Sequence, residues 1–393
     1  MSYIDKLLSS KDEMTLAGVT AGYRPYLLAK IALETNNRTV FITTDDAAMS
    51  ATVESARYFQ PELEILEFPA WDCLPYDRAS PALHTTSERL AALSAISKPA
   101  TRPQLIVTTV NAAIQRVLEP SRLQELVTRL APGTVIEQEK LIVFLYANGF
   151  VRVDTVADSG EFAARGGIID LFPPGANRPL RLDLFGDEIE TLREFDPIDQ
   201  RTVGSIESFE LLPVSEFLLN EESITRFRTR YRELFGAVST SDSLYQSISE
   251  GRRLSGMEHW LPLLEERLVP FFDYFRDDDL FIRDAASSSS VQSQFSSIAD
   301  YYKNRQEADK ANLSSYRPLS PESLYLTPDE WEQQQERAPV HIVSEYDEPA
   351  SSSVISLSIS SPRDFAPERA RNENIYGALA AHLNNLTKSG TTA

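Results

Sequence analysis

The chain has 393 residues, of which 42% are hydrophobic and 24% charged, a composition typical of a globular protein of roughly two to four domains. The formal net charge of −20 disfavours a surface that binds nucleic acid throughout, because duplex binding depends on neutralising phosphates, and it favours a protein partner. No apolar run approaches the ~20 residues of a membrane span, and no signal-peptide pattern is present. With one cysteine and four scattered histidines, we expect a cytoplasmic protein without disulfide, metal site or cofactor.

Residues 1–118 are predicted to form the first part of an α/β domain. Three short β-rich runs, Arg38–Thr44, Leu63–Phe68 and Gln104–Val110, alternate with helical patterns. Near-continuous apolar strands between helices are typical of a parallel sheet that is covered on both faces. Asp45, directly before one helical pattern, is a candidate N-cap.

Residues 119–213 have a different pattern. A helical segment precedes four short segments in which apolar and polar residues alternate, and turns such as F-P-P-G-A-N-R-P separate them. Alternation with short turns indicates antiparallel hairpins. We therefore predict a small α+β domain inserted in the chain.

Residues 214–338 return to helical patterns, with one apolar strand at Asp279–Arg283 and a serine run at Ser287–Ser290 that we interpret as a loop. The alternation in Ser351–Ser361 predicts a strand, and a helical pattern follows it. A strand and one helix cannot bury a core, so residues 339–393 are expected to be a linker and the truncated start of a further domain. The chain is then a fragment of a longer protein.

The stretch G-V-T-A-G-Y-R-P, residues 18–25, lies between a strand-like and a helical segment, where a phosphate loop would lie. A working loop has the pattern G-x-x-x-x-G-K-[ST], in which the lysine neutralises phosphate and the hydroxyl holds magnesium. Gly18 fits the first position, but Tyr23 replaces the second glycine, Arg24 the lysine and Pro25 the hydroxyl residue. Proline also lacks the N–H that would contact phosphate.

This loop is therefore interpreted as a degenerate phosphate loop that is not expected to bind ATP. A glycine-containing packing turn explains it best, and a weak anion site built from helix N–H groups and Arg24 stays open as an alternative. The loop residues in question are Gly18, Thr20, Gly22 and Arg24.

Three further motifs carry a family resemblance: F-P-A-W-D-C-L-P-Y-D at residues 68–77, E-F-A-A-R-G-G-I-I-D-L-F-P-P-G at 161–175, and the run from Arg181 to Thr202. Together with residues 18–25 they resemble the N-terminal module of the bacterial transcription-repair coupling factors, the Mfd family. That module is itself similar to the excision-repair helicase UvrB. The motif at 68–77 favours Mfd over UvrB.

The resemblance implies an arrangement of domains. Residues 1–118 and 214–338 would be the two halves of a RecA-like domain, derived from phosphate-loop proteins, and residues 119–213 an inserted domain that docks UvrA. The motif G-M-E-H-W at 256–260 would belong to the resumed half. Residues 339–393 would begin the family's next domain.

The resemblance also implies a function. Full-length family members are ATP-dependent DNA translocases that displace stalled RNA polymerase and recruit UvrA for transcription-coupled nucleotide excision repair. The motor and polymerase-binding domains would lie beyond residue 393, so this chain is expected to have no catalytic residues and to reach DNA and RNA polymerase only through other domains. In the family, the protein's own C-terminal domain masks the UvrA-binding surface.

Arg165, Arg181 and Phe185 are the candidate UvrA-binding residues. Side chains alternate along a strand, so positions 181, 183 and 185 share one face. Arginine and aromatic residues are enriched at the centres of protein interfaces. An intramolecular ion pair of the type Arg181–Asp183, with a partly buried ring, is the alternative; the resemblance favours the contact with UvrA.

Two other functions stay open. A UvrB-like nucleotide-binding helicase domain is disfavoured by Tyr23 and Pro25 in the loop. A non-specific DNA-binding module is disfavoured by the net charge. UvrB also uses a long, tyrosine-rich hairpin to clamp DNA, whereas Pro69, Pro75 and Pro81 make such a hairpin unfavourable here because proline cannot donate to a strand ladder.

Overall fold

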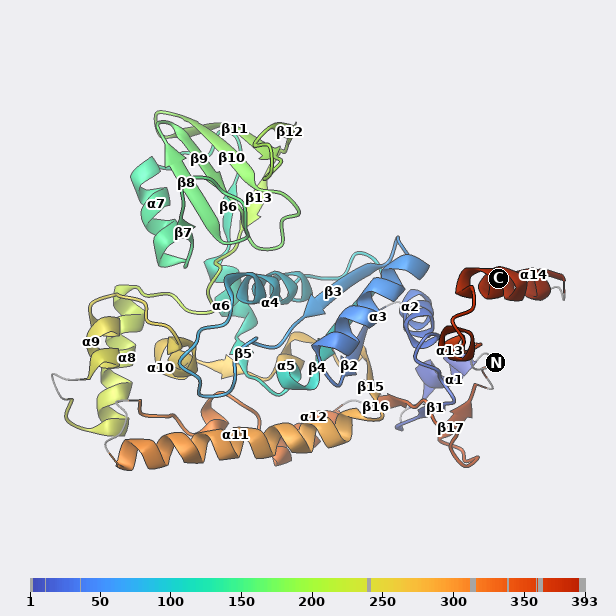
Figure 1. Cartoon of the computed structure of the whole chain (residues 1–393). Helices are drawn as coiled ribbons and strands as arrows, with labels where there is room; N and C mark the ends of the chain where they lie inside the picture. The colour runs from blue at the N-terminus through green and yellow to red at the C-terminus, as the bar shows by residue number, and fades with distance from the viewer. Residues whose placement is uncertain are drawn as a thin grey trace.

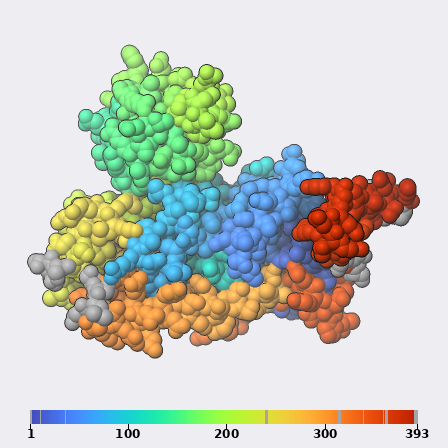
Figure 2. All heavy atoms as spheres, viewed as in Figure 1, coloured from blue at the N-terminus to red at the C-terminus, as the bar shows by residue number. Residues whose placement is uncertain are grey.

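A computed structural model gives the fold. It describes residues 3–10, 12–35, 37–238, 242–311, 316–337, 339–357, 359 and 363–388. Within them the chain forms a large α/β body and a smaller lobe, which stands apart from the body in the ribbon and space-filling views (Figures 1 and 2).

The body is built on a seven-stranded sheet with the order β17-β1-β16-β15-β2-β4-β3. Every neighbouring pair in it is parallel. Its strands are β1 (Thr15–Ala17), β2 (Arg38–Thr43), β3 (Glu64–Phe68), β4 (Gln104–Thr109), β15 (Leu280–Asp284), β16 (Val340–Val343) and β17 (Val354–Ser356). The predicted α/β class with a parallel sheet is confirmed.

Both faces of this sheet are covered, which is why its strands are near-continuously apolar. In β2, Phe41 packs into one core while Val40 and Ile42 pack into the other. The Phe41 side is covered by α1 (Tyr3–Ser9), α2 (Arg24–Glu34) and α3 (Asp46–Phe59). The opposite side is covered by helices that include α4 (Leu83–Ile96), α5 (Val110–Ala113) and the long α11 (Ser287–Lys310).

The lobe is built on a six-stranded sheet with the order β12-β11-β10-β9-β8-β7. All its pairs are antiparallel except β7 with β8, so the predicted hairpins are confirmed. Helix α7 (Gln138–Ala147) inserts Leu141 and Leu145 into the core on one face. The strands are β7 (Val151–Arg152), β8 (Glu161–Arg165), β9 (Ile168–Leu171), β10 (Leu180–Phe185), β11 (Glu188–Phe195) and β12 (Thr202–Ser205).

The remaining elements join these parts. Short strand pairs form between β6 (Thr128–Leu130) and β13 (Phe209–Leu211), at the base of the lobe, and between β5 (Val117–Leu118) and β14 (Leu268–Val269). The other helices are α6 (Pro120–Leu126), α8 (Glu221–Phe235), α9 (Ser243–Ser249), η1 (Met257–Trp260), α10 (Leu261–Leu264), η2 (Phe271–Tyr274), η3 (Pro321–Ser323), α12 (Pro328–Arg337), α13 (Ala366–Ala370) and α14 (Ile375–Lys388).

The C-terminal strands correct one prediction. β16 and β17, which were assigned to a linker and a further domain at residues 339–393, pair on either side of β1 in the large sheet. Their backbone groups complete the ladder of that sheet, so the body continues at least to Ser356. Residues 358 and 360–361 of the strand predicted at Ser351–Ser361 lie outside the described residues.

Two local interpretations also change. The serine run predicted as a loop forms the first turn of α11, and α6 packs Leu123 and Leu126 into the core of the body. The lobe therefore begins near Thr128, whereas the boundary predicted from the sequence was residue 119. The candidate cap is confirmed, because the Asp45 carboxylate accepts a hydrogen bond from the Ala48 N–H at 2.9 Å. The predicted joins at residues 213 and 214 stay predictions.

Within the described ranges, no helix is both long enough and apolar enough to cross a bilayer.

Candidate functional site

The three predicted contact residues lie on one face of the lobe sheet. Arg165 on β8 pairs in register with Ile168 on β9, which pairs in turn with Asp183 on β10. In the adjacent row, Asp170 on β9 pairs with Arg181 on β10. Because strand side chains alternate between faces, these residues lie opposite the apolar face on which α7 packs.

Arg181 is held rigidly on this face. Its Nε and Nη2 atoms donate to the two carboxylate oxygens of Asp170 at 2.6 and 2.8 Å, and its guanidinium lies 4.7 Å from the ring centroid of Phe195. The hydrogen bonds to Asp170 raise the pKa of Arg181 above its usual value. Two parallel hydrogen bonds and a ring face fix a guanidinium better than a single charge contact does.

The ion pair considered as an alternative is therefore real, but its partner is different. Arg181 pairs with Asp170, while Asp183 accepts hydrogen bonds from Arg193 and Thr191. The sequence analysis did not assign Asp170 or Phe195 to this site. Strand register supplies the missing signal, since directly opposed residues are close enough to pair.

Phe185 is the most exposed aromatic side chain described in the lobe, with 82% of its surface accessible. It ends β10 beside the β8–β9 turn, where the Leu184 N–H donates to the Gly167 carbonyl at 2.8 Å. A Cβ on Gly167 would lie 2.9 Å from the Leu184 carbonyl oxygen, so glycine permits this close approach. The ring is exposed, contrary to the partly buried ring of the alternative interpretation. Ile168, on the same face, is 39% exposed.

Arg165 lies at the exposed end of β8, and its Nη2 donates to the Asp154 carbonyl. Arg165 lies two strand spacings across the sheet from β10, and its register partner there, Asp183, is two residues from both Arg181 and Phe185. The Cα atom of Arg165 is therefore about 12 Å from those of Arg181 and Phe185. The three side chains thus define a surface patch, which we call the Arg181 face, and they do not converge on a single point. Such spacing suits recognition of a macromolecule better than catalysis.

The loop at Gly18 is bonded to the segment of the chain that directly follows β16. Gly18 has a left-handed φ of 73°, and its N–H donates to the Tyr346 carbonyl at 3.0 Å. The Val19 N–H donates to the Ser344 carbonyl at 2.9 Å. Amides that would wrap phosphate in a working loop are therefore already bonded to backbone.

Arg24, at the lysine position of the loop, is also engaged. It forms ion pairs with Asp284 and with Glu345, the latter at 2.6 Å. Thr20 accepts hydrogen bonds from two amides of the following turn through its carbonyl, while Gly22 has open space where a Cβ would be. Two carboxylates at the cation disfavour an anion here, which argues against the weak anion site considered above.

The motifs at 68–77 and 256–260 pack against each other. The Tyr76 N–H donates to Nε2 of His259 at 2.8 Å, and both rings are buried. Gly256 has a φ of 80°, and a Cβ there would lie 2.7 Å from the backbone of Arg78. Trp71 is also buried. These aromatic residues build the core of the body and leave no open platform for stacking on bases.

Comparison with known proteins shows which proteins this chain is similar to. A family model described as the UvrB interaction domain matches residues 128–217. The chain is 34% identical to the transcription-repair-coupling factor of Haemophilus influenzae over an alignment of 323 residues. This alignment covers 81% of this chain and 27% of the Haemophilus influenzae protein. The chain is homologous to the N-terminal region of the transcription-repair coupling factors.

Two further transcription-repair-coupling factors show similar sequence identity to this chain. The transcription-repair-coupling factor of Escherichia coli K12 is 31% identical over 321 residues, covering 81% of this chain and 27% of its own length. The transcription-repair-coupling factor of Myxococcus xanthus is 31% identical over 285 residues, which cover 70% of this chain and 24% of that protein. The chain thus spans about a quarter of the length of these transcription-repair coupling factors.

The family match falls on the lobe. Residues 128–217 run from β6 to just past β13, and they include Arg165, Arg181 and Phe185. The match begins at the same residue as β6, which supports the lobe as a recognisable unit of this chain.

Proposed function

We propose that this chain is the UvrB-like, UvrA-recruiting part of a transcription-repair coupling factor, and that the Arg181 face of its lobe binds UvrA during transcription-coupled nucleotide excision repair. The family match to residues 128–217 and the homology to transcription-repair coupling factors support this proposal. In it, residues 128–213 form the UvrA-binding domain, and the RecA-like body flanks that domain on both sides.

The observation that carries the proposal is the exposed ring of Phe185. Its surface is 82% accessible, on a sheet face where Arg181 and Asp183 are already paired with neighbours. Burying a phenylalanine side chain is worth about 1.5–3 kcal/mol. A partner that covers this ring gains that free energy without first breaking an ion pair.

Arg181 complements the ring. Asp170 and Phe195 already fix its guanidinium, so binding orders few additional rotamers. In this proposal Arg181 and Arg165 present N–H donors to acidic or carbonyl groups of UvrA, and Phe185 supplies the apolar anchor.

Replacing Phe185 with Ala is expected to weaken UvrA binding roughly 30-fold, which corresponds to about 2 kcal/mol for a hot-spot aromatic. Isothermal titration calorimetry of the purified chain with UvrA measures this. Val143→Ala is the matched control, because Val143 is 66% exposed on α7, on the opposite side of the lobe sheet. Equal affinities for wild type, Phe185→Ala and Val143→Ala would contradict the assignment of the face.

Arg181→Ala is a less direct test, because it leaves the Asp170 carboxylate without its partner. The effect of Arg181→Ala on UvrA affinity therefore has to be compared with its effect on stability, measured as the midpoint of denaturant-induced unfolding of the variant. Phe185→Ala avoids this difficulty, since a ring that is 82% exposed contributes little to the folded state.

The proposal assigns no catalytic residue to this chain. The engaged amides of Gly18 and Val19 and the two carboxylates on Arg24 support a loop without ATP. By homology, ATP-driven DNA translocation and the displacement of RNA polymerase would belong to parts of the transcription-repair coupling factor outside this chain. The C-terminal domain of the coupling factor would also lie outside this chain, and it would mask the Arg181 face until the motor engages RNA polymerase. We place this function in the cytoplasm.

A further inference from the structure

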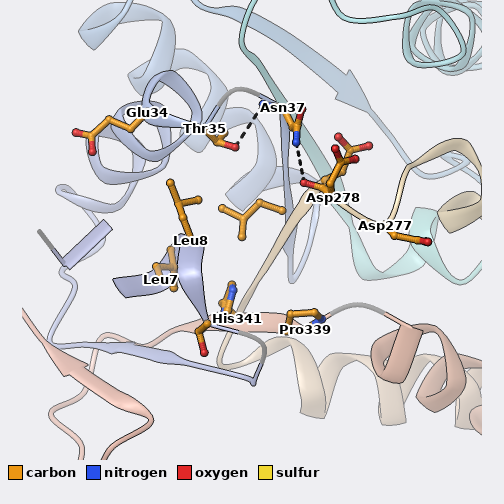
Figure 3. A pocket seen from close by; sticks show the side chains of 12 residues that line it. Leu7, Leu8, Glu34, Thr35, Asn37, Asp277, Asp278, Pro339 and His341 are labelled. Atoms are coloured by element: carbon orange, nitrogen blue, oxygen red, sulfur yellow. Dashed lines mark hydrogen bonds between the residues drawn. The ribbon is translucent and has the colours of Figure 1, made fainter. Parts of the chain in front are cut away.

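A hollow of about 500 Å³ opens at the amino-terminal edge of the large sheet, on a different part of the molecule from the Arg181 face (Figure 3). It lies where β2, β15 and β16 begin and where α2 ends, with α1 on one side. The proposed contact with UvrA uses none of its residues. The question is which chemistry the hollow can accept.

His341 supplies one unused hydrogen-bond donor. The side chain is 1% exposed, and its Nδ1 accepts a hydrogen bond from the Met14 N–H at 3.1 Å. A neutral imidazole that accepts at Nδ1 carries its proton at Nε2. That Nε2–H has no partner among the described residues, and His341 lines the hollow, where Figure 3 shows its ring pointing inward.

The tautomer decides what the donor can bind. A protonated Nε2 cannot ligate a metal ion, but it donates well to a carbonyl oxygen. Burial lowers the pKa of His341 to about 4, so the ring stays neutral at physiological pH. The Nε2–H faces the hollow without a protein partner, and an occupant that brings an acceptor gains a hydrogen bond there.

The wall beside His341 is apolar. It is formed by Leu7 and Leu8 of α1, with Leu280 and Pro339 at the starts of two strands. Leu8 is 39% exposed, which leaves apolar area for an occupant to cover.

The rim is acidic. Its carboxylates belong to Glu34 and to the run Asp277–Asp279, and none of the described residues that line the hollow is Lys or Arg. Both oxygens of Asp279 accept backbone N–H groups, Arg337 approaches Asp277 at 3.4 Å, and Lys30 approaches Glu34 at 3.9 Å. Asp278 is exposed and forms no ion pair with a described residue, so its charge is free to attract a cation.

We propose that this hollow is a docking site for a short peptide segment of a partner protein in which an apolar residue is flanked by Lys or Arg. A backbone carbonyl of the segment accepts the Nε2–H of His341, the apolar side chain covers Leu8 and Leu280, and the basic side chain meets Asp278. Charge complementarity selects this occupant, because the exposed Asp278 attracts a cation and none of the described lining residues is Lys or Arg.

Histidine NMR of the intact chain tests the proposal, because there are only four imidazoles to assign. The probe is the capped peptide Gly-Arg-Leu-Lys-Gly, with Gly-Glu-Leu-Glu-Gly as the acidic counterpart. His341 is expected as the Nε2–H tautomer, whereas His259 accepts at Nε2 and is therefore the Nδ1–H tautomer. This difference separates the two buried rings spectroscopically.

The basic peptide is expected to shift the His341 signals and leave those of His259 unchanged, and the acidic peptide is expected to shift neither. Asp278→Lys, a surface change that does not alter the buried ring, is expected to weaken the basic peptide at least about tenfold by replacing attraction with repulsion. Asp300→Lys is the matched control, an exposed aspartate on α11 away from the hollow.

Three results would overturn the proposal: an Nδ1–H tautomer at His341, no shift of its signals with excess basic peptide, or equal affinity of wild type and Asp278→Lys. None of these results bears on UvrA binding, and a failed UvrA experiment leaves this site untouched.

Discussion

Replacing Arg89 with Met is expected to lower the free energy of unfolding by about 3–5 kcal/mol, the cost of leaving one partner of a buried ion pair alone. Arg89 is fully buried, and its Nε lies 2.5 Å from Oε1 of Glu216, which is 2% exposed. Its Nη1 donates to the Pro69 carbonyl at 2.7 Å, and its guanidinium lies 4.5 Å from the ring centroid of Phe68. The pair joins α4 to the segment by which the chain returns from the lobe.

Urea unfolding followed by circular dichroism measures this effect. Arg201→Met is the control, because that arginine is 85% exposed and its ion pair with Asp199 spans 3.9 Å; we expect a change below about 0.5 kcal/mol. The double variant Arg89→Met with Glu216→Leu is expected to recover part of the loss, since no buried charge is then left alone. A single Arg89→Met variant as stable as wild type would show that the pair is not an anchor.

Acidification from pH 6.5 to pH 4 is expected to destabilise the chain through His259. Burial lowers the pKa of this ring to about 4, against about 6.5 in an unfolded chain. Over that range the unfolded state binds a proton that the folded state does not, so the free energy of unfolding falls as the pH falls. The integrated effect is about 3 kcal/mol for one such ring, and His341 acts in the same direction.

The measurement is the difference between wild type and His259→Gln in the pH dependence of the free energy of unfolding. Taking a difference is necessary because burial raises the pKa of Glu258, which stabilises the folded state on acidification. The exposed residue His84 provides the control variant His84→Gln. We expect a shallower slope for His259→Gln only; identical slopes for all three proteins would rule out a buried neutral His259.

Much of the fold could be predicted because its signals are local. β2 and β4 are apolar runs buried on both faces, and the hairpins of the lobe alternate with period two between turn residues. β16 and β17 could not be assigned in this way, because they contribute only four and three residues, and their place beside β1 depends on contacts some 330 residues apart in sequence. Nothing local distinguishes such strands from the start of another domain.

The start of α11 was missed for a related reason. Four serines favour loops and caps over helix interiors, yet Ser287 is buried at the first turn and Val291 packs into the core one turn later. Tertiary packing thus overrides a weak local preference, as it does for many helices.

The sequence predicted which side chains of the candidate site share a face of the sheet, but it did not predict which residue forms the ion pair with Arg181. Positions 181, 183 and 185 do share a face, but the partner of Arg181 is Asp170 on the next strand, where the sequence analysis considered Asp183. Residues two apart on one strand are roughly 7 Å apart, whereas directly opposed residues on neighbouring strands are about 5 Å apart. Register, which the sequence does not state, therefore decided the ion pair.

The account's central claim is that UvrA binds the Arg181 face, and hydrogen–deuterium exchange of the chain with and without UvrA tests it most directly. The informative amides are in the exposed turns of the lobe sheet, at Gly166, Gly167 and Gly186, since strand amides are slow to exchange even in the free chain. We expect UvrA to slow exchange at these turns and along β8 and β10, and to leave the body unchanged. Protection confined to the body, with the lobe turns exchanging as fast as in the free chain, would contradict the account.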